Sequence, residues 1–184
     1  MAHVGSLLGV GAPEVFMAVR EYPSFLVSMY CEYIRHREFI HFADYFELYM
    51  KSEFSWVKVV GDIVAALPDA KVRIWDFAKF RMLEGRVFSL MLGQDAGFLK
   101  APEGPVRESF SDAAMRSYAA LSAVLSHQEL KNLINPISRA LPKGETFKAF
   151  NPLAEETAAV LKEQYRRDLG TIAEKFPSIE FIEE

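Results

Sequence analysis

A run of five apolar residues, Val15 to Val19, is the first stretch of the chain that predicts a regular element. The run does not alternate with polar positions, and this pattern is typical of a parallel strand buried on both faces. Arg20 ends the run. Pro23 then favours the first turn of a helix, where its missing N–H leaves no hydrogen bond unmade. Apolar residues recur at helical spacing from Phe25 to Ile34, so we expect a strand followed directly by a helix.

The rest of the chain predicts one more strand and several helices. Lys71 to Asp76 is short and rich in β-favouring residues, which predicts the second strand. After an aromatic-rich segment at 39–50, amphipathic helices are expected at 56–67, at 80–92 before Gly93, at 111–125 and, as shorter pieces, at 127–140. Asn151 and Pro152 predict the start of a long last helix, as a capping residue followed by proline.

Two strands are fewer than a normal sheet contains, since sheets average about 5–6 strands. We therefore expect an α/β fold with a partial parallel sheet, a largely helical C-terminal half, and a missing strand before residue 1. The length of 184 residues suits one domain, 1–184, better than two. Without its neighbour, the strand at Val15–Val19 would expose a pairing edge, which predicts a homodimer, a bound partner or poor solubility.

The composition and charge of the chain exclude some classes of function. The chain is 51% apolar and 25% charged, as is ordinary for a globular protein, and its formal net charge is −4. A general nucleic-acid-binding protein would need a basic face, so no nucleic-acid partner is expected and any anion site must be local. No apolar run approaches the ~20 residues of a membrane span, and no signal peptide is visible, so a cytoplasmic protein without membrane contact is expected.

Single residues with reactive or metal-binding side chains mostly favour structural roles. Cys31 is the only cysteine and lies in an apolar helical stretch, which predicts a buried, inert thiol. His36 and His41 flank Glu38, but five positions on a helix place them about 140° apart, so no metal site is predicted. Trp56 and Trp75 are expected in the core.

Arg20 and Ser28 form the most informative pair in the sequence. They stand eight positions apart across the predicted junction of strand and helix. That junction directs a guanidinium and a hydroxyl toward the point beyond the carboxyl end of a buried strand, where open α/β sheets bind ligands. A guanidinium can grip a phosphate with two parallel hydrogen bonds. An ion pair of Arg20 with Glu21 or Glu32, and a hydrogen bond from Ser28 to its own helix, are the structural alternatives.

The segment from Arg20 to Ser28, written Arg-x-x-Pro-x-x-x-x-Ser after a strand, resembles the sulfotransferase family, most nearly its bacterial carbohydrate-type or generic members. The resemblance covers roughly residues 14–170. Weaker supporting matches are Ser55-Trp56 before a helix, the stretches 72–80, 106–111 and 147–152, and the closing stretch 161–168. It implies a three-layer α/β/α fold like that of P-loop NTPases.

In the family, the equivalents of Arg20 and Ser28 hold the 3′-phosphate of 3′-phosphoadenosine 5′-phosphosulfate (PAPS), and Arg107 is a further candidate contact. The resemblance thus implies PAPS as the donor and a hydroxyl acceptor, such as a carbohydrate, for the sulfuryl group. The loop that cradles the 5′-phosphosulfate precedes this region in the family. The segment Gly5–Gly9 lacks the Gly-Lys-Ser/Thr ending of such a loop, so the loop is expected to be absent and catalysis to depend on its being supplied.

No catalytic residue is assigned from the sequence. The general base of the family lies upstream of the 3′-phosphate strand, a region in which His3 is a weak candidate. The aromatic residues at 39–49 are expected mostly in the core, with the border of an acceptor cleft as the alternative. Two rival functions stay open: a non-catalytic remnant that keeps the scaffold, and a mainly helical interaction module in which the Arg20 and Ser28 match is accidental.

Overall fold

The structure is a computed structural model that describes residues 12–100 and 109–183. In chain order, the elements are β1 (Glu14–Val19), α2 (Tyr22–His36), α3 (Phe42–Lys51), α4 (Trp56–Ala66), β2 (Lys71–Asp76), η1 (Phe77–Lys79), α5 (Phe80–Leu92), α6 (Asp112–Ser122), α7 (His127–Ala140), α8 (Glu155–Lys175) and β3 (Glu180–Phe181). Of the described residues, 12–21, 54–100 and 162–183 form one compact unit, the sheet unit, and 22–53 and 109–161 form another, the helical unit.

The sheet unit is built on three parallel strands in the order β1-β2-β3. β1 and β2 pair along their whole length, and Val19 lies opposite Asp76 at their carboxyl ends. β3 pairs with β2 through only two residues, Glu180 opposite Arg73 and Phe181 opposite Ile74. The sequence predicts two strands, so β3 is an addition that only the structure reveals. The α/β class expected from the sequence is confirmed in this coarse form.

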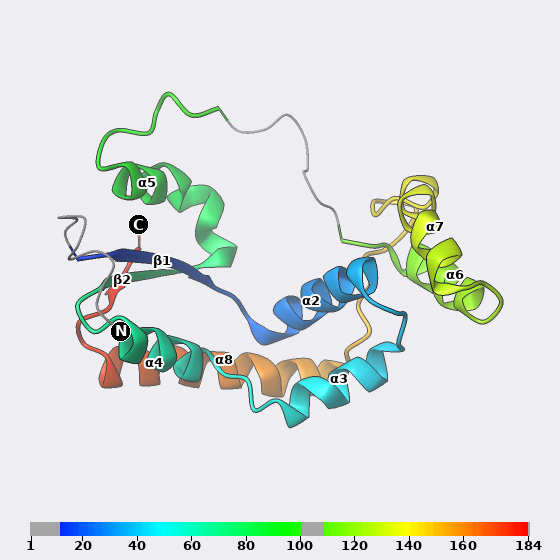
Figure 1. Cartoon of the computed structure of the whole chain (residues 1–184), viewed down its shortest axis with the longest axis horizontal. Coiled ribbons are helices and arrows are strands. Elements are labelled where there is room, and N and C mark those ends of the chain that lie inside the picture. The colour runs from blue at the N-terminus through cyan, green and yellow to red at the C-terminus, as the bar shows by residue number, and fades with distance from the viewer. Residues whose placement is uncertain (1–11, 101–108, 184) are drawn as a thin grey trace. The chain divides into compact units, whose positions relative to one another are not determined.

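Helices of the sheet unit cover both faces of the strands (Figure 1). α5 packs on one face, where Leu83 and Val87 meet Trp75 of β2 and the partly buried Phe16 and Ala18 of β1. α4 and the C-terminal part of α8 lie on the opposite side in the same view. Strand side chains alternate between faces, so successive residues of β2 contribute to both layers of the core.

The prediction that β1 is buried on both faces is wrong for most of the strand. Val19 is buried, whereas residues 15–18 are only half-buried. The reason is position, because β1 forms an edge of the described part of the sheet while β2 has a strand on each side. An apolar run without alternation predicts burial but cannot say how many neighbouring strands supply it.

A buried arginine links the three strands. The Arg73 guanidinium of β2 donates to the Glu14 carboxylate of β1 and, through Nε at 3.0 Å, to Glu180 of β3. It also lies over the Phe16 ring, 5.2 Å from the centroid. Burial would lower the pKa of Arg73, but the hydrogen bonds with Glu180 and Glu14 raise it. The network therefore keeps a buried charge paired at the amino-terminal end of the sheet.

The same network predicts loss of stability in acid. Hydrogen bonds from Lys71 and Arg73 hold the pKa of Glu180 below its ordinary value of 4.5. The ionised form is thus favoured by folding, and its contribution is present above pH 4.5 and lost as the pH falls through the lower folded-state value. We expect the difference in unfolding free energy between the wild type and Glu180→Gln to shrink below that pH. Urea unfolding at a series of pH values measures it, and a pH-independent difference would contradict the assignment.

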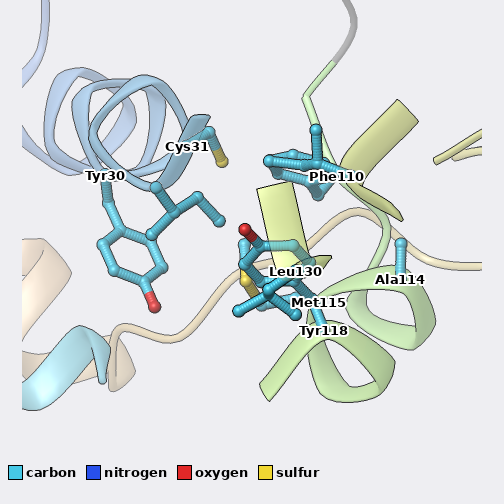
Figure 2. Close-up of a cluster of buried hydrophobic side chains, with 9 residues drawn as sticks. Tyr30, Cys31, Phe110, Ala114, Met115, Tyr118 and Leu130 are labelled. Carbon is cyan, nitrogen blue, oxygen red and sulfur yellow. The ribbon is translucent and has the colours of Figure 1, made fainter. Parts of the chain in front are cut away.

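The helical unit has a core of its own. Side chains of α2, α6 and α7 meet there with Phe110, as Figure 2 shows for Tyr30 and Cys31 beside Met115, Tyr118 and Leu130. Aromatic rings of α3 complete it: the Tyr30 ring lies 5.3 Å from both Phe42 and Tyr45, centroid to centroid. The expectation that the aromatic residues at 39–49 lie mostly in the core is met in part: Phe39, Phe42 and Tyr45 pack against this core while partly buried, and no residue of α3 is fully buried. Cys31 is buried as predicted, and burial raises the pKa of its thiol.

Serine caps explain where α4, α6 and α7 begin. Ser55, Ser111 and Ser126 each accept a hydrogen bond from a backbone N–H in the first turn of α4, α6 and α7. The 127–140 region forms one helix rather than several short ones, and Ser126 and Glu129 form a capping box at its start.

The predicted start of the last helix at Asn151 and Pro152 is wrong, because α8 begins at Glu155. Residues just before Asn151 are held extended by backbone hydrogen bonds between 148–150 and 110–112. The chain turns into the helix only after leaving that pairing.

Candidate binding site at the carboxyl end of the sheet

Arg20 is the first residue beyond the carboxyl end of β1. Its strand neighbour Val19 lies opposite Asp76, so β1 and β2 end at the same edge of the sheet. In open parallel sheets this edge is where ligands bind. The predicted strand-to-helix junction is thus confirmed as a local element: β1 ends at Val19, and α2 begins at Tyr22.

The Arg20 guanidinium lies 4.9 Å from the centroid of the Phe77 ring, which follows β2 directly. The Arg20 side chain is half-buried, and burial lowers its pKa. An arginine stays charged even so, since its pKa lies far above neutral pH. A partly buried cation is well suited to bind an anion, because part of the cost of removing its water has already been met when the protein folds.

Trp56 ties the backbone of Arg20 to the start of α4. Its indole Nε1 donates to the Arg20 carbonyl at 2.9 Å. The backbone N–H of Trp56 in turn donates to Oδ2 of Asp168, a buried carboxylate of α8, also at 2.9 Å. A carboxylate at this position is favoured by the partial positive charge of a helix N-terminus. These two hydrogen bonds connect the end of β1, the start of α4 and the middle of α8 at the Arg20 peptide.

Acidic groups lie at the same edge. Tyr165 of α8 is buried, and its pKa is raised first by burial and then by the neighbouring carboxylates of Asp76 and Glu21. Asp76 also accepts a hydrogen bond from the backbone N–H of Ala78 at 2.8 Å. The edge therefore combines the Arg20 guanidinium, which can bind an anion, with carboxylate oxygens, which can accept hydrogen bonds from hydroxyl groups.

The structure places the predicted site residues in different parts of the chain. Arg20 belongs to the sheet unit, whereas Ser28 is a half-buried residue in the middle of α2 in the helical unit. Convergence of Arg20 and Ser28 on one ligand therefore stays a prediction. Arg107, His3 and the segment Gly5–Gly9 lie outside the described residues.

The histidines and acidic residues give no metal site in the described residues. No group of three or more His, Cys, Asp or Glu side chains there could hold a metal ion. His36 and His41 are exposed, and His36 lies 3.6 Å from the Glu32 carboxylate. Across residues 12–100 and 109–183, none of the helices has both the length and the apolar character that a bilayer crossing requires.

Sequence reasoning missed the residues that surround Arg20. Trp56 was expected as a core residue at the start of a helix, and Asp168 as part of the closing helix. Glu21 was considered as an ion-pair partner, while Asp76 and Tyr165 were not assigned to the site. The position of Asp76 at the end of the second predicted strand was a usable signal, because parallel strands end at the same edge.

Comparisons of the chain with protein-family models, with curated proteins and with solved structures gave no match.

Proposed function

We propose that the protein is sulfotransferase-like and that it binds the 3′-phosphate of 3′-phosphoadenosine 5′-phosphosulfate through Arg20. The observation that carries the proposal is the place of Arg20, a half-buried cation directly beyond the carboxyl end of a parallel strand. The resemblance of the Arg20 to Ser28 segment to the sulfotransferase family supports the same ligand. Ser28 and Arg107 are the further phosphate contacts in this proposal.

The chemistry of the site favours an anion with at least two oxygens, such as a phosphate, over a simple halide. A guanidinium presents paired N–H donors that match two oxygens of a phosphate. The Phe77 ring holds the guanidinium through its π face, and such a contact restricts the side chain without offering a hydrogen-bond acceptor. The formal net charge of −4 gives no general attraction for anions, so affinity must come from these local groups.

In the proposed reaction, the donor supplies a sulfuryl group that passes to the hydroxyl of an acceptor such as a carbohydrate. Arg20 and Ser28 would hold a phosphate that does not itself react. Their role is to fix the donor, since transfer of this kind depends on positioning and on charge neutralisation. No residue is assigned as the general base. A non-catalytic protein that retains only nucleotide binding would share this part of the proposal.

Replacing Arg20 with alanine is expected to weaken binding of adenosine 3′,5′-bisphosphate by about 10- to 100-fold, the usual cost of losing charge-assisted hydrogen bonds. Arg20→Lys should recover part of the affinity, because it restores the charge but not the paired donors. Ser28→Ala should cost less than Arg20→Ala. Isothermal titration calorimetry measures all four affinities.

The matched control is Arg116→Ala, which removes one positive charge from an exposed pair with Asp112 on α6. It should bind like the wild type. Adenosine 5′-monophosphate, which lacks the 3′-phosphate, should bind weakly to every variant. Absence of binding to a folded wild type, or an equal loss in Arg20→Ala and Arg116→Ala, would contradict the proposal.

A further inference from the structure

The peptide that follows Arg20 is held by a side chain distant in sequence. Arg20 lies in the short link between the end of β1 at Val19 and the start of α2 at Tyr22. A backbone carbonyl in such a link belongs to neither the strand ladder nor the helix and needs another donor. The indole N–H of Trp56 supplies one at 2.9 Å.

The position of Trp56 is itself fixed from two sides. Ser55 caps α4 by accepting from the N–H of Lys58, and Asp168 accepts from the N–H of Trp56. Trp56 is buried, and its ring lies 5.2 Å from that of Phe54, centroid to centroid. The indole is therefore a rigid donor, and its direction is set by α4 and α8.

Holding the Arg20 carbonyl fixes the plane of the peptide that follows Arg20. The direction of the Arg20 side chain depends on that backbone, and the Phe77 ring then limits where the guanidinium can lie. A side chain held in this way loses less conformational freedom when a ligand binds, which favours affinity.

We propose that Trp56 is a positioning residue for Arg20, with Asp168 holding Trp56 in place. As a statement about ligand affinity, this inference rests on the proposed function of Arg20. As a statement about the orientation of Arg20, it stands on the hydrogen bonds from Trp56 to the Arg20 carbonyl and to Asp168 and on the contact with the Phe77 ring.

The test compares Trp56→Phe with Trp75→Phe. Both variants remove an indole N–H from a buried tryptophan of the sheet unit, but Trp75 lies in the cluster between β2 and α5, among Leu83, Val87 and Ile182. If a general loss of core packing disturbs Arg20, the Arg20 signal and the nucleotide affinity should change in both variants. If the lost hydrogen bond to the Arg20 carbonyl is the cause, they should change only in Trp56→Phe.

Two readouts are needed. The first is the Nε–Hε signal of Arg20 in ¹⁵N nuclear magnetic resonance spectra, identified by its disappearance in Arg20→Lys. It is expected to shift or broaden in Trp56→Phe and to stay unchanged in Trp75→Phe. The second is the affinity for adenosine 3′,5′-bisphosphate, which Trp56→Phe should lower by about five-fold, the usual effect of one hydrogen bond. Circular dichroism checks that each variant is folded.

Asp168 provides a second pair of variants if Trp56→Phe does not fold. Asp168→Asn keeps an oxygen that can accept from the Trp56 N–H, whereas Asp168→Ala does not. The Arg20 signal should move more in Asp168→Ala than in Asp168→Asn.

The possible outcomes separate the two proposals. If the wild type binds the nucleotide but Trp56→Phe matches it in both readouts, the positioning role is overturned and the proposed function stands. If the wild type does not bind, the proposed function fails, and the Arg20 signal still decides the positioning role. An equal change in Trp56→Phe and Trp75→Phe would also overturn it.

Discussion

A Tyr30→Ala variant is expected to lose about 3–5 kcal/mol of unfolding free energy, the usual cost of removing a large aromatic side chain from a core. Tyr30 is buried in the helical unit, where its ring contacts Phe42, Tyr45 and Phe150. Its removal leaves a cavity between α2, α3 and the chain near Phe150 that rigid helices can only partly close. Urea unfolding followed by circular dichroism measures the loss.

The control is Tyr30→Phe, which keeps the ring and removes the hydroxyl that donates to the Ile40 carbonyl at 2.8 Å. Its expected cost is about 1 kcal/mol, the typical net contribution of one hydrogen bond. The difference in unfolding free energy between Tyr30→Phe and Tyr30→Ala measures the contribution of ring packing. If Tyr30→Ala were no less stable than Tyr30→Phe, the core described around Tyr30 would be wrong.

Elements with strong local signals were predictable from the sequence. The second strand and α5 were predicted with the bounds that the structure shows, Lys71–Asp76 and Phe80–Leu92. β-favouring residues define the strand. Gly93 ends the helix by adopting a positive φ of 66°, a conformation that glycine reaches without steric cost. Such signals lie within a few residues of the feature that they determine.

Elements that depend on distant partners were not predictable. β3 contains only two residues, and it is a strand because it pairs with β2, about a hundred residues earlier. α8 begins at Glu155 rather than at Pro152, after a segment at 148–150 that pairs with 110–112. The local pattern gave no signal for β3, whose backbone is determined by hydrogen bonds with β2, and it placed the start of α8 too early.

The candidate site shows the same difference between features set by neighbouring residues and features set by distant ones. The place of Arg20 at the end of a strand was read from neighbouring residues and is confirmed. The contacts that hold Arg20 could not be predicted in this way, because the hydrogen bond between Trp56 and Asp168 joins residues that are 112 positions apart. Local sequence signals therefore place the candidate charge of Arg20 but not the hydrogen bonds that support it.

Replacing Arg73 with leucine is expected to cost about 2–3 kcal/mol of unfolding free energy. Removing one member of a buried ion pair usually costs more, about 3–5 kcal/mol, because it leaves a buried charge without a partner. Here the loss is smaller, since the side chains of Glu14 and Glu180 are 44% and 38% exposed and water can solvate them. Leucine also recovers some burial of apolar surface. Urea unfolding at neutral pH measures the change.

A triple variant separates charge from packing. Combining Arg73→Leu with Glu14→Gln and Glu180→Gln removes the two carboxylates that Arg73 otherwise pairs across the three strands. If repulsion and lost pairing explain the cost, the triple variant should be more stable than Arg73→Leu alone. If both were equally unstable, the cost would come from the packing of the Arg73 guanidinium on the Phe16 ring rather than from its pairing with the carboxylates.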